Sequence, residues 1–329
     1  MNDIQFPAGR ALDCIGIGRL CIDLNANEIN RPMEETITFT KYVGGSPANI
    51  TIALSRLGQR TGFVGRVADD QHGRFITNYL HKNGIDTSGV VIDHSGSVTG
   101  LAFTEIKSPS ECSILMYRDN VADLRLEPGD VREDYIASAR SLLVSGTALA
   151  ASPSREAVFR ALAFARKHGV VIVFDIDYRP YTWRSREETA VYCSLVAERS
   201  DVIFGGREEF DILEGDTADS PGKDERTAHT WLNHQAKLVL VKRGGSGSTA
   251  FVRNGSSYPG RTFPADVVKT FGAGDSFGGA FIHGLLQGWS IDRCQTYGAA
   301  AASIVVASHS CSDAMPTAEQ IDQIISGKA

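Results

Sequence analysis

The chain has 329 residues but only six cysteines, and no two of them form a Cys-x-x-Cys pair. The spacing typical of structural zinc sites and disulfide frameworks is therefore missing, and we expect free thiols in a cytoplasmic protein. No stretch approaches the roughly 18 apolar residues of a membrane span, and the first residues lack the basic and apolar regions of a signal peptide. Lysine and arginine are outnumbered by aspartate and glutamate, 33 to 39, and form no basic run. This balance argues against a nucleic-acid surface.

Two common nucleotide-binding motifs are also incomplete. No Gly-x-x-x-x-Gly-Lys-Ser/Thr loop occurs anywhere in the chain. The run Gly16-Ile17-Gly18-Arg19-Leu20-Cys21 begins like a dinucleotide fingerprint, but Cys21 stands where the third glycine belongs and no helical pattern comes after it. We therefore keep a dinucleotide-dependent oxidoreductase only as a remote alternative, which NAD binding would test.

Apolar strand-like runs alternate with amphipathic helical runs along most of the chain. This alternation predicts an α/β fold, in which helices flank both faces of a mostly parallel central sheet, and ligands of such sheets bind beyond the carboxyl ends of the strands. The expected strands are Cys14–Gly18, Thr61–Val67, Ser141–Val144, Val170–Asp175, Val202–Phe204 and Lys237–Val241, and the expected helices are Ala48–Leu57, Gly73–Lys82, Ser154–Lys167, Arg186–Arg199, Ala228–Asn233, Asp275–Gln287 and Ile291–Ala307.

Two segments interrupt this alternation. Asn27–Tyr42 has a polar, threonine-rich strand pattern, and Val98–Tyr117 contains two more expected strands, Thr99–Lys107 and Ser113–Tyr117. We expect residues 19–43 and 98–118 to form a small β-sheet lid on a single domain of residues 1–329. The edge of such a lid could pair with that of a second copy, so a homodimer is plausible.

The run Lys269-Thr270-Phe271-Gly272-Ala273-Gly274-Asp275 is the most informative of the chain. It comes after Ala265–Val268, which we expect to be a strand, and it opens a helical pattern. Gly272 and Gly274 permit a close approach to a ligand, and the first turn of a helix attracts an anion. The carboxylate of Asp275 lies beside this cradle, as transfer of a phosphoryl group to a hydroxyl requires. A glycine-rich turn with an ordinary helix-terminal aspartate remains the alternative.

Three other glycine-containing runs come directly after an expected strand segment. In Gly44–Asn49, Ser46 and Pro47 suit the first positions of a helix, and Asn49 could both donate to and accept from a polyol. Gly65–Gly73 has the carboxylates that a helix start favours, and Lys242–Ser248 could lie against a nucleotide. Each run taken alone also fits a plain helix cap or turn.

The order of these runs resembles the ribokinase (PfkB-type) family of sugar kinases over nearly the whole chain. The resemblance implies a ribokinase-like fold and the transfer of the γ-phosphate of ATP, with Mg²⁺, to a sugar hydroxyl. It also implies a role for each group of residues: Asp275 as the base; the amides of Gly272, Ala273 and Gly274 as the anion hole; Asp23, Gly45 and Asn49 in sugar binding; and Lys242, Gly244 and Gly247 with Gly272 and Gly274 at ATP.

The chain departs from the family pattern at two positions. The family's Asn-x-x-Glu motif organises Mg²⁺ through water, and here Glu209 keeps the acid while Gly206 replaces the asparagine. The residue before Thr270 is commonly an aspartate of a K⁺ site, and here it is Lys269. Because an ammonium repels K⁺ and supplies a positive charge itself, we hypothesise that K⁺ is not required, although a surface lysine is the simpler interpretation.

The substrate is indicated by arginines close to the expected strand ends. Tyr117 and Arg118 lie at the end of a lid strand and Arg179 lies just past Val170–Asp175, and an arginine can bind a carboxylate with two hydrogen bonds. Several stretches, among them Asp177–Trp183 and Ser308–Pro316, resemble kinases of keto-deoxy sugar acids. The resemblance implies phosphorylation of the terminal hydroxyl, O6, of such an acid, with 5-dehydro-2-deoxy-D-gluconate of myo-inositol catabolism as the first candidate.

Alternatives to this substrate remain open. A 2-keto-3-deoxygluconate kinase, a fructokinase or a ribokinase would share the same motifs, and so would a sugar-binding regulator without catalytic activity. His309 falls in a stretch that could lie near the nucleotide base, but a histidine with ordinary hydrogen bonds is the simpler interpretation.

Overall fold

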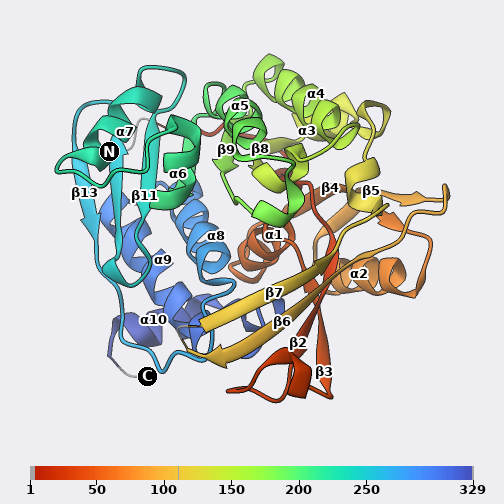
Figure 1. Ribbon diagram of the computed structural model, residues 1–329. Helices are drawn as coiled ribbons and strands as arrows, with labels where there is room; N and C mark the ends of the chain where they lie inside the picture. The colour runs from red at the N-terminus through yellow and green to blue at the C-terminus, as the bar shows by residue number, and fades with distance from the viewer. Residues whose placement is uncertain (1–3, 110, 328–329) are drawn as a thin grey trace.

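The computed structural model describes residues 4–109 and 111–327, and its strands form two separate sheets (Figure 1). The larger sheet has nine strands in the order β13-β12-β11-β10-β9-β8-β1-β4-β5. Its pairs are parallel except for β11 with β12 and β12 with β13. The strands are β1 Leu12–Ile17, β4 Thr61–Ala68, β5 Asp86–Asp93, β8 Ala139–Ser145, β9 Val171–Asp175, β10 Val202–Gly206, β11 Leu238–Lys242, β12 Ser248–Val252 and β13 Ser257–Gly260.

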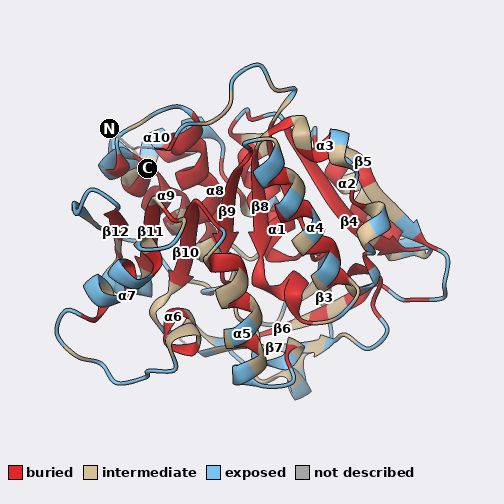
Figure 2. Ribbon diagram, turned by 90° about the horizontal axis from the view of Figure 1, so that it is seen from above, coloured by how far each residue is buried: buried red, intermediate tan, exposed pale blue. Residues whose placement is uncertain are grey.

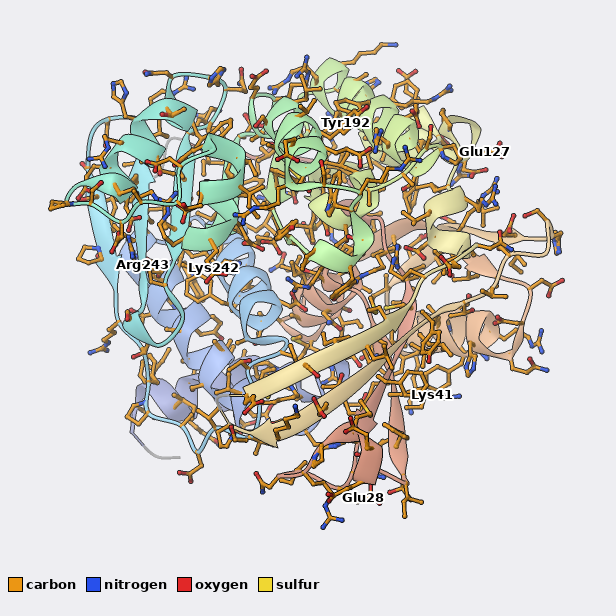
Figure 3. The ribbon with its side chains drawn as sticks, viewed as in Figure 1. Glu28, Lys41, Glu127, Tyr192, Lys242 and Arg243 are labelled. Atoms are coloured by element: carbon orange, nitrogen blue, oxygen red, sulfur yellow. The ribbon has the colours of Figure 1, made fainter. Side chains whose placement is uncertain are left out.

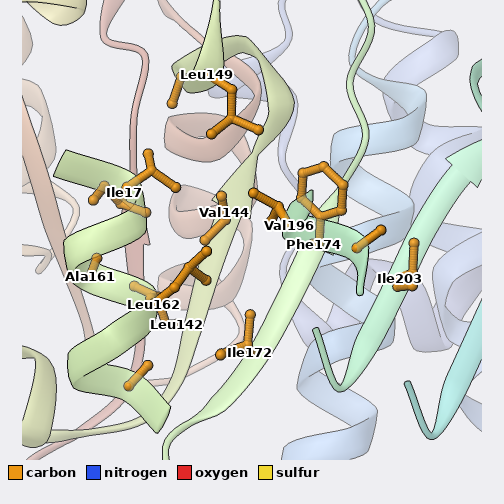
Figure 4. Packing of buried hydrophobic residues seen from close by; sticks show 14 of the residues in the cluster. Ile17, Leu142, Val144, Leu149, Ala161, Leu162, Ile172, Phe174, Val196 and Ile203 are labelled. Carbon is orange, nitrogen blue, oxygen red and sulfur yellow. The ribbon is translucent and has the colours of Figure 1, made fainter. Parts of the chain in front are cut away.

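Helices cover both faces of this sheet, and the buried strands lie between them in Figure 2. Apolar side chains of α1, α8 and α9 pack on one face, and those of α3 to α7 pack on the other; Figure 4 shows part of this second cluster, including Phe174, Leu162 and Val196. The helices are α1 Ser46–Arg56, α2 Gln71–Lys82, α3 Glu133–Ala137, α4 Ser154–Lys167, α5 Arg186–Ala197, α6 Arg207–Glu214, α7 Lys223–Leu232, α8 Ala273–Leu286, α9 Ile291–Val306 and α10 Ala318–Ile325.

The smaller sheet has four strands in the order β3-β2-β6-β7. They are β2 Cys21–Ala26, β3 Phe39–Gly44, β6 Gly100–Ser108 and β7 Glu111–Tyr117. Strands β6 and β7 are the yellow pair that runs diagonally across Figure 1. Residues 18–20 connect β1 of the main sheet to β2 of this sheet. Segments that are distant in the sequence therefore meet where the two sheets approach each other.

The expected alternation of strands and helices is confirmed, and each expected element of the main sheet and its helices is present within a few residues. The second sheet is also present, although the threonine-rich pattern of residues 27–42 yields a strand only from Phe39 onward. The expected strand Ala265–Val268 is wrong, because no strand is assigned over this segment. The amides of Val268 and Lys269 instead donate to the carbonyl of Val306 at the end of α9.

All six cysteines are free, and only Cys112 is not buried. Within the part of the chain that the structure describes, no helix is both long enough and apolar enough to span a membrane.

Candidate active site

A cavity of about 310 Å³ lies between strand β7 and the carboxyl ends of the central strands. Parallel sheets bind ligands at this edge. Its walls come from β7, from the ends of β9 and β11, from the segment after β9, and from the first turns of α6 and α8. The lining residues are Cys112, Ser113, Ile114, Asp175, Asp177, Tyr178, Arg179, Pro180, Tyr181, Glu209, Lys242, Thr270, Phe271, Gly272, Gly274 and Asp275.

The first turn of α8 forms one end of this cavity. Gly272 is the N-cap residue in the left-handed conformation, with φ of 81°, and a Cβ at this position would lie 2.8 Å from Sγ of Cys311. A side chain is therefore excluded on two grounds. The helix begins at Ala273, so its unpaired amides and the positive end of its dipole face the same region. This geometry suits an anion.

Asp275 is buried in that first turn, and two polar side chains of α1 hold its carboxylate. Oδ1 accepts a hydrogen bond from the hydroxyl of Ser46 at 2.7 Å, and Oδ2 accepts one from Nδ2 of Asn49 at 2.8 Å. Burial and the negative charge of Asp177 raise the pKa of Asp275, while the two hydrogen bonds oppose that rise. A carboxylate with a raised pKa and neutral partners is suited to accept a proton.

The start of α1 differs by one residue from the expected helix cap. Gly45, with φ of 108°, is the N-cap residue, and Ser46 is already helical. A Cβ on Gly45 would lie 2.3 Å from the carbonyl oxygen of Arg19, so this close approach requires glycine. The Ser46 hydroxyl is thereby free to bind Asp275, and Oδ1 of buried Asn49 has no hydrogen-bond partner among the described residues.

Lys242, labelled in Figure 3, is the last residue of β11 and lies among carboxylates. Its Nζ is 3.3 Å from Oδ1 of Asp175, and a Cβ on Gly274 would lie 3.5 Å from the same Nζ. Burial lowers the pKa of Lys242, but Asp175 and Glu209 raise it more, so the side chain carries a positive charge beside the start of α8.

Glu209 occupies the first turn of α6, and backbone amides fix its carboxylate. Oε2 accepts from the amide of Gly206 at 2.6 Å, and Oε1 accepts from that of Tyr178 at 2.8 Å. No cluster of three or more His, Cys, Asp or Glu suited to a metal occurs in residues 4–109 and 111–327. Mg²⁺ at phosphoryl-transfer sites commonly uses one or two carboxylates, with water and phosphate oxygens, so Glu209 and Asp175 fit such a role.

Asp177 and Arg179 form an ion pair in the loop after β9. The pair is 2.9 Å long between Nη2 and Oδ1, and Ser145 donates to the other Asp177 oxygen at 2.8 Å. Asp177 has a φ of 40°, which is uncommon for a residue with a side chain and is often found at functional sites.

Lys269 is fully buried, contrary to the alternative of a surface lysine. Its Nζ donates to the carbonyl of Phe271 at 2.7 Å and lies 3.5 Å from Sγ of Cys311. The ammonium is therefore placed directly behind the backbone that precedes the α8 cradle.

Other predicted residues lie outside the lining of the cavity. Tyr117 is exposed and its ring packs edge-on against Phe103, while Arg118 forms a buried pair with Asp123 at 2.7 Å. Their part in substrate binding stays a prediction. The half-buried Asp23 also lies outside the lining.

Gly244 and Gly247 belong to the short turn between β11 and β12, outside the cavity lining. His309 is a histidine with ordinary hydrogen bonds. Its ring nitrogens contact the Tyr42 hydroxyl and the carbonyl of Ala26, which tie it to the smaller sheet.

Sequence reasoning missed Arg19 and the part that Ser46 plays. Arg19 is 6% exposed. Asp177 and Tyr181, which line the cavity, raise the pKa of its guanidinium. Its position directly after the first strand, at the carboxyl edge of a parallel sheet, was the signal available.

The model of the pfkB family of carbohydrate kinases matches residues 12–318. The chain belongs to this family. It is 65% identical over 325 residues to the 5-dehydro-2-deoxygluconokinase of Geobacillus thermodenitrificans, covering 99% of this chain and 96% of the relative. It is 64% identical over 328 residues to the enzyme of the same name from Geobacillus kaustophilus, covering 99% and 97%. The predicted family is thereby confirmed.

Solved structures share this fold. A PfkB protein from Polaromonas sp. JS666 has a TM-score of 0.80 at 28% identity, covering 93% of this chain and 99% of that one. The fold is also shared with a fructokinase from Xylella fastidiosa that was solved with bound ATP, at a TM-score of 0.83 and 24% identity, covering 96% of this chain and 98% of that one. An E. coli neighbour solved in complex with ATP and Mg²⁺ has a TM-score of 0.86 at 24% identity, with coverage of 96% and 99%.

Proposed function

We propose that the protein transfers the γ-phosphate of ATP to O6 of 5-dehydro-2-deoxy-D-gluconate, a step of myo-inositol catabolism. The observation that carries the proposal is the Asp275 carboxylate, which neutral donors hold beside the helix start in a cavity that also contains Lys242 and Arg179. The substrate is supported by the name of the relatives at 65% and 64% identity.

In the proposed reaction, Asp275 accepts the proton of the O6 hydroxyl. The oxygen then forms a bond to the γ-phosphorus while the bond between that phosphorus and the bridging oxygen of ADP breaks. ADP and the 6-phosphorylated acid leave, and the proton passes from Asp275 to water. The carboxylate must be ionised before each turnover, so its protonation limits activity at low pH.

The amides of Gly272, Ala273 and Gly274 would hold the negative charge of the transferred group, because helix-start donors are already oriented toward it. Lys242 would neutralise ATP phosphates from the other side, as its distance to Gly274 supports, and Gly244 and Gly247 would line the nucleotide path. Bound Mg²⁺ would neutralise charge on the phosphates. Glu209 would act on it through water, because both of its carboxylate oxygens already accept backbone hydrogen bonds.

Residues of α1, the smaller sheet and the β9 loop would bind the sugar. Asn49 would use its free Oδ1 to accept from a hydroxyl, and Gly45 would permit close approach of the backbone. Asp23 would accept from a hydroxyl farther along the sugar chain. Arg179, which lines the cavity, would contact the acid or the transferred phosphate.

We further propose that K⁺ is not required, since the buried Lys269 ammonium supplies a positive charge behind the anion hole. The smaller sheet would act as a lid, because Cys112, Ser113 and Ile114 of β7 already border the cavity. Its exposed edge strand could also pair two copies into a homodimer. A cytoplasmic location is supported by the free cysteines.

An ADP-release assay tests the proposal, with ATP, Mg²⁺ and a panel of 5-dehydro-2-deoxygluconate, 2-keto-3-deoxygluconate, fructose and ribose. We expect the first compound to have the highest kcat/KM, and Asp275→Asn to lose about 10²–10⁴-fold in kcat with little change in ATP binding. A neutral sugar as the best substrate would refute the substrate, near-normal turnover of Asp275→Asn would refute the mechanism, and no ADP release at all would favour a sugar-binding regulator.

A further inference from the structure

Arg19 is a buried cation for which the structure provides no ion-pair partner among the described residues. The residue lies in the short connection between β1 of the main sheet and β2 of the smaller sheet. It is 6% exposed, and its Nε and Nη1 have no hydrogen-bond partner within residues 4–109 and 111–327. Leaving a charged donor buried and unsatisfied is costly, so such a group points to a partner that the protein chain does not supply.

Arg19 does not itself line the cavity, but it lies against the start of α1, where a Cβ on Gly45 would lie 3.6 Å from Cβ of Arg19. Burial lowers the pKa of Arg19, but the acidic groups of Cys21 and Asp177, with Tyr181 and Asp23 after them, raise it further. The guanidinium therefore remains charged. Asp177 and Tyr181 both line the cavity, and Asp177 also acts on the pKa of Asp275. Arg19 and the base thus share a neighbour.

The acidic neighbours of Arg19 act on its charge without forming an ion pair with it. Asp177 pairs with Arg179 at 2.9 Å and accepts from Ser145. Burial raises the pKa of Asp23, although Arg19 and Lys269 oppose that rise. No ion pair to Arg19 is formed by the carboxylates of the described residues.

We infer that Arg19 binds the carboxylate of the sugar acid and so sets the preference for acids over neutral sugars. This inference rests on the proposed function. A guanidinium matches a carboxylate in geometry and can donate two parallel hydrogen bonds to it, and Nε and Nη1 of Arg19 have no hydrogen-bond partner among the described residues. Arg179 is less suited to this role, because its charge is already balanced by Asp177. Arg118 is less suited because its charge is already paired with that of Asp123.

The test compares Arg19→Gln with the wild-type protein in steady-state assays on 5-dehydro-2-deoxygluconate. We expect KM for the acid to rise about 10- to 100-fold, the range for losing a charged hydrogen bond, with a smaller change in kcat. KM for ATP should change less than about twofold, because the lost contact concerns one substrate only. Arg19→Lys keeps the charge but not the paired donors, so it should lie between the two.

A matched control is Arg140→Gln. Arg140 is a partly buried arginine that also has an unpartnered Nε, but it pairs with Asp13 at the opposite end of the same strands. Its replacement should leave both KM values unchanged. Thermal unfolding of each variant shows whether it is folded, and Arg19→Lys keeps the comparison available if Arg19→Gln is not.

The inference is overturned if Arg19→Gln keeps the wild-type KM for the acid, or if KM for ATP rises as much as that for the acid. It is also overturned if Arg118→Gln raises KM for the acid and Arg19→Gln does not. Failure of the proposed function looks different, since the wild-type protein would then show no preference for the acid over fructose.

Discussion

Replacing Ser46 by alanine should move the acid limb of the pH profile to higher pH. The Ser46 hydroxyl lies between two carboxylates, 2.7 Å from Oδ1 of Asp275 and 3.2 Å from Oδ2 of Asp175. A hydroxyl has one proton to donate, and the shorter distance assigns it to Asp275. This hydrogen bond favours the ionised form of Asp275 and lowers its pKa, against burial and the charge of Asp177, which raise it.

The size of the shift depends on the strength of that bond. A hydrogen bond to a charged group contributes about 1.5–3 kcal/mol, and one pKa unit corresponds to about 1.4 kcal/mol. Loss of the bond should therefore raise the pKa of Asp275 by about one to two units. Because the base must be ionised, activity is lost as the pH falls through this pKa, and the variant should lose it at the higher pH. The lower end is expected if Asn49, which still donates to Oδ2, partly compensates.

The assay is kcat/KM for the sugar acid as a function of pH, which reports groups of the enzyme before the sugar binds. Ser154→Ala is the matched control: Ser154 is also the first residue of a helix, is fully buried, and donates to a backbone carbonyl at 2.8 Å. Its profile should not move. An acid limb of Ser46→Ala that stays in place, or moves to lower pH, would refute both the assigned bond and Asp275 as the base.

Replacing KCl by tetramethylammonium chloride at constant ionic strength should change kcat less than about twofold. Lys269→Met should lower kcat by about tenfold or more, because it loses the charged hydrogen bond to Phe271. A several-fold activation by K⁺ would contradict the role of Lys269. Gly272→Ala should cost about 1–3 kcal/mol in the free energy of unfolding because of its positive φ, with lower kcat; a urea titration showing wild-type stability would count against the strained cap. Arg118→Gln should destabilise the protein by about 3–5 kcal/mol, because buried Asp123 loses its partner, while KM for the acid at 25 °C stays as it was.

The parts of the fold that depend on local patterns were predictable. Strands such as Val171–Asp175 are continuous apolar runs between helical segments, and both faces of the central sheet are covered, as such runs indicate. Residues 21–26 were included in the expected lid, but no strand was placed over β2, because its short run CIDLNA contains the polar Asp23 and Asn25. The apolar pattern of Ala265–Val268 misled for the opposite reason: its amides reach the end of α9 and no neighbouring strand among the described residues is available.

The functional site shows the same difference between features that are local in the sequence and features that depend on packing. Asp275 and the glycines before it are adjacent in the sequence, so their chemistry could be predicted from one motif. The Ser46 hydroxyl lies 229 residues from Asp275 in the chain, and only the packing of α1 against α8 brings them together. The burial of Lys269 and Arg19 is equally non-local, because a residue type specifies a charge but not the groups that surround it.

The distribution of partners around the cavity supports a division of roles among its charges. The cations Lys242 and Arg179 pair with carboxylates, whereas Asp275 receives hydrogen bonds only from the uncharged Ser46 and Asn49 in the described structure. An ion pair with a lysine would stabilise the carboxylate strongly and lower its pKa, which would make Asp275 a weaker base. Neutral donors fix its orientation at a smaller cost in basicity. Because Lys242 and Arg179 do not pair with Asp275, they can stabilise negative charge on a phosphate or carboxylate without lowering the basicity of Asp275.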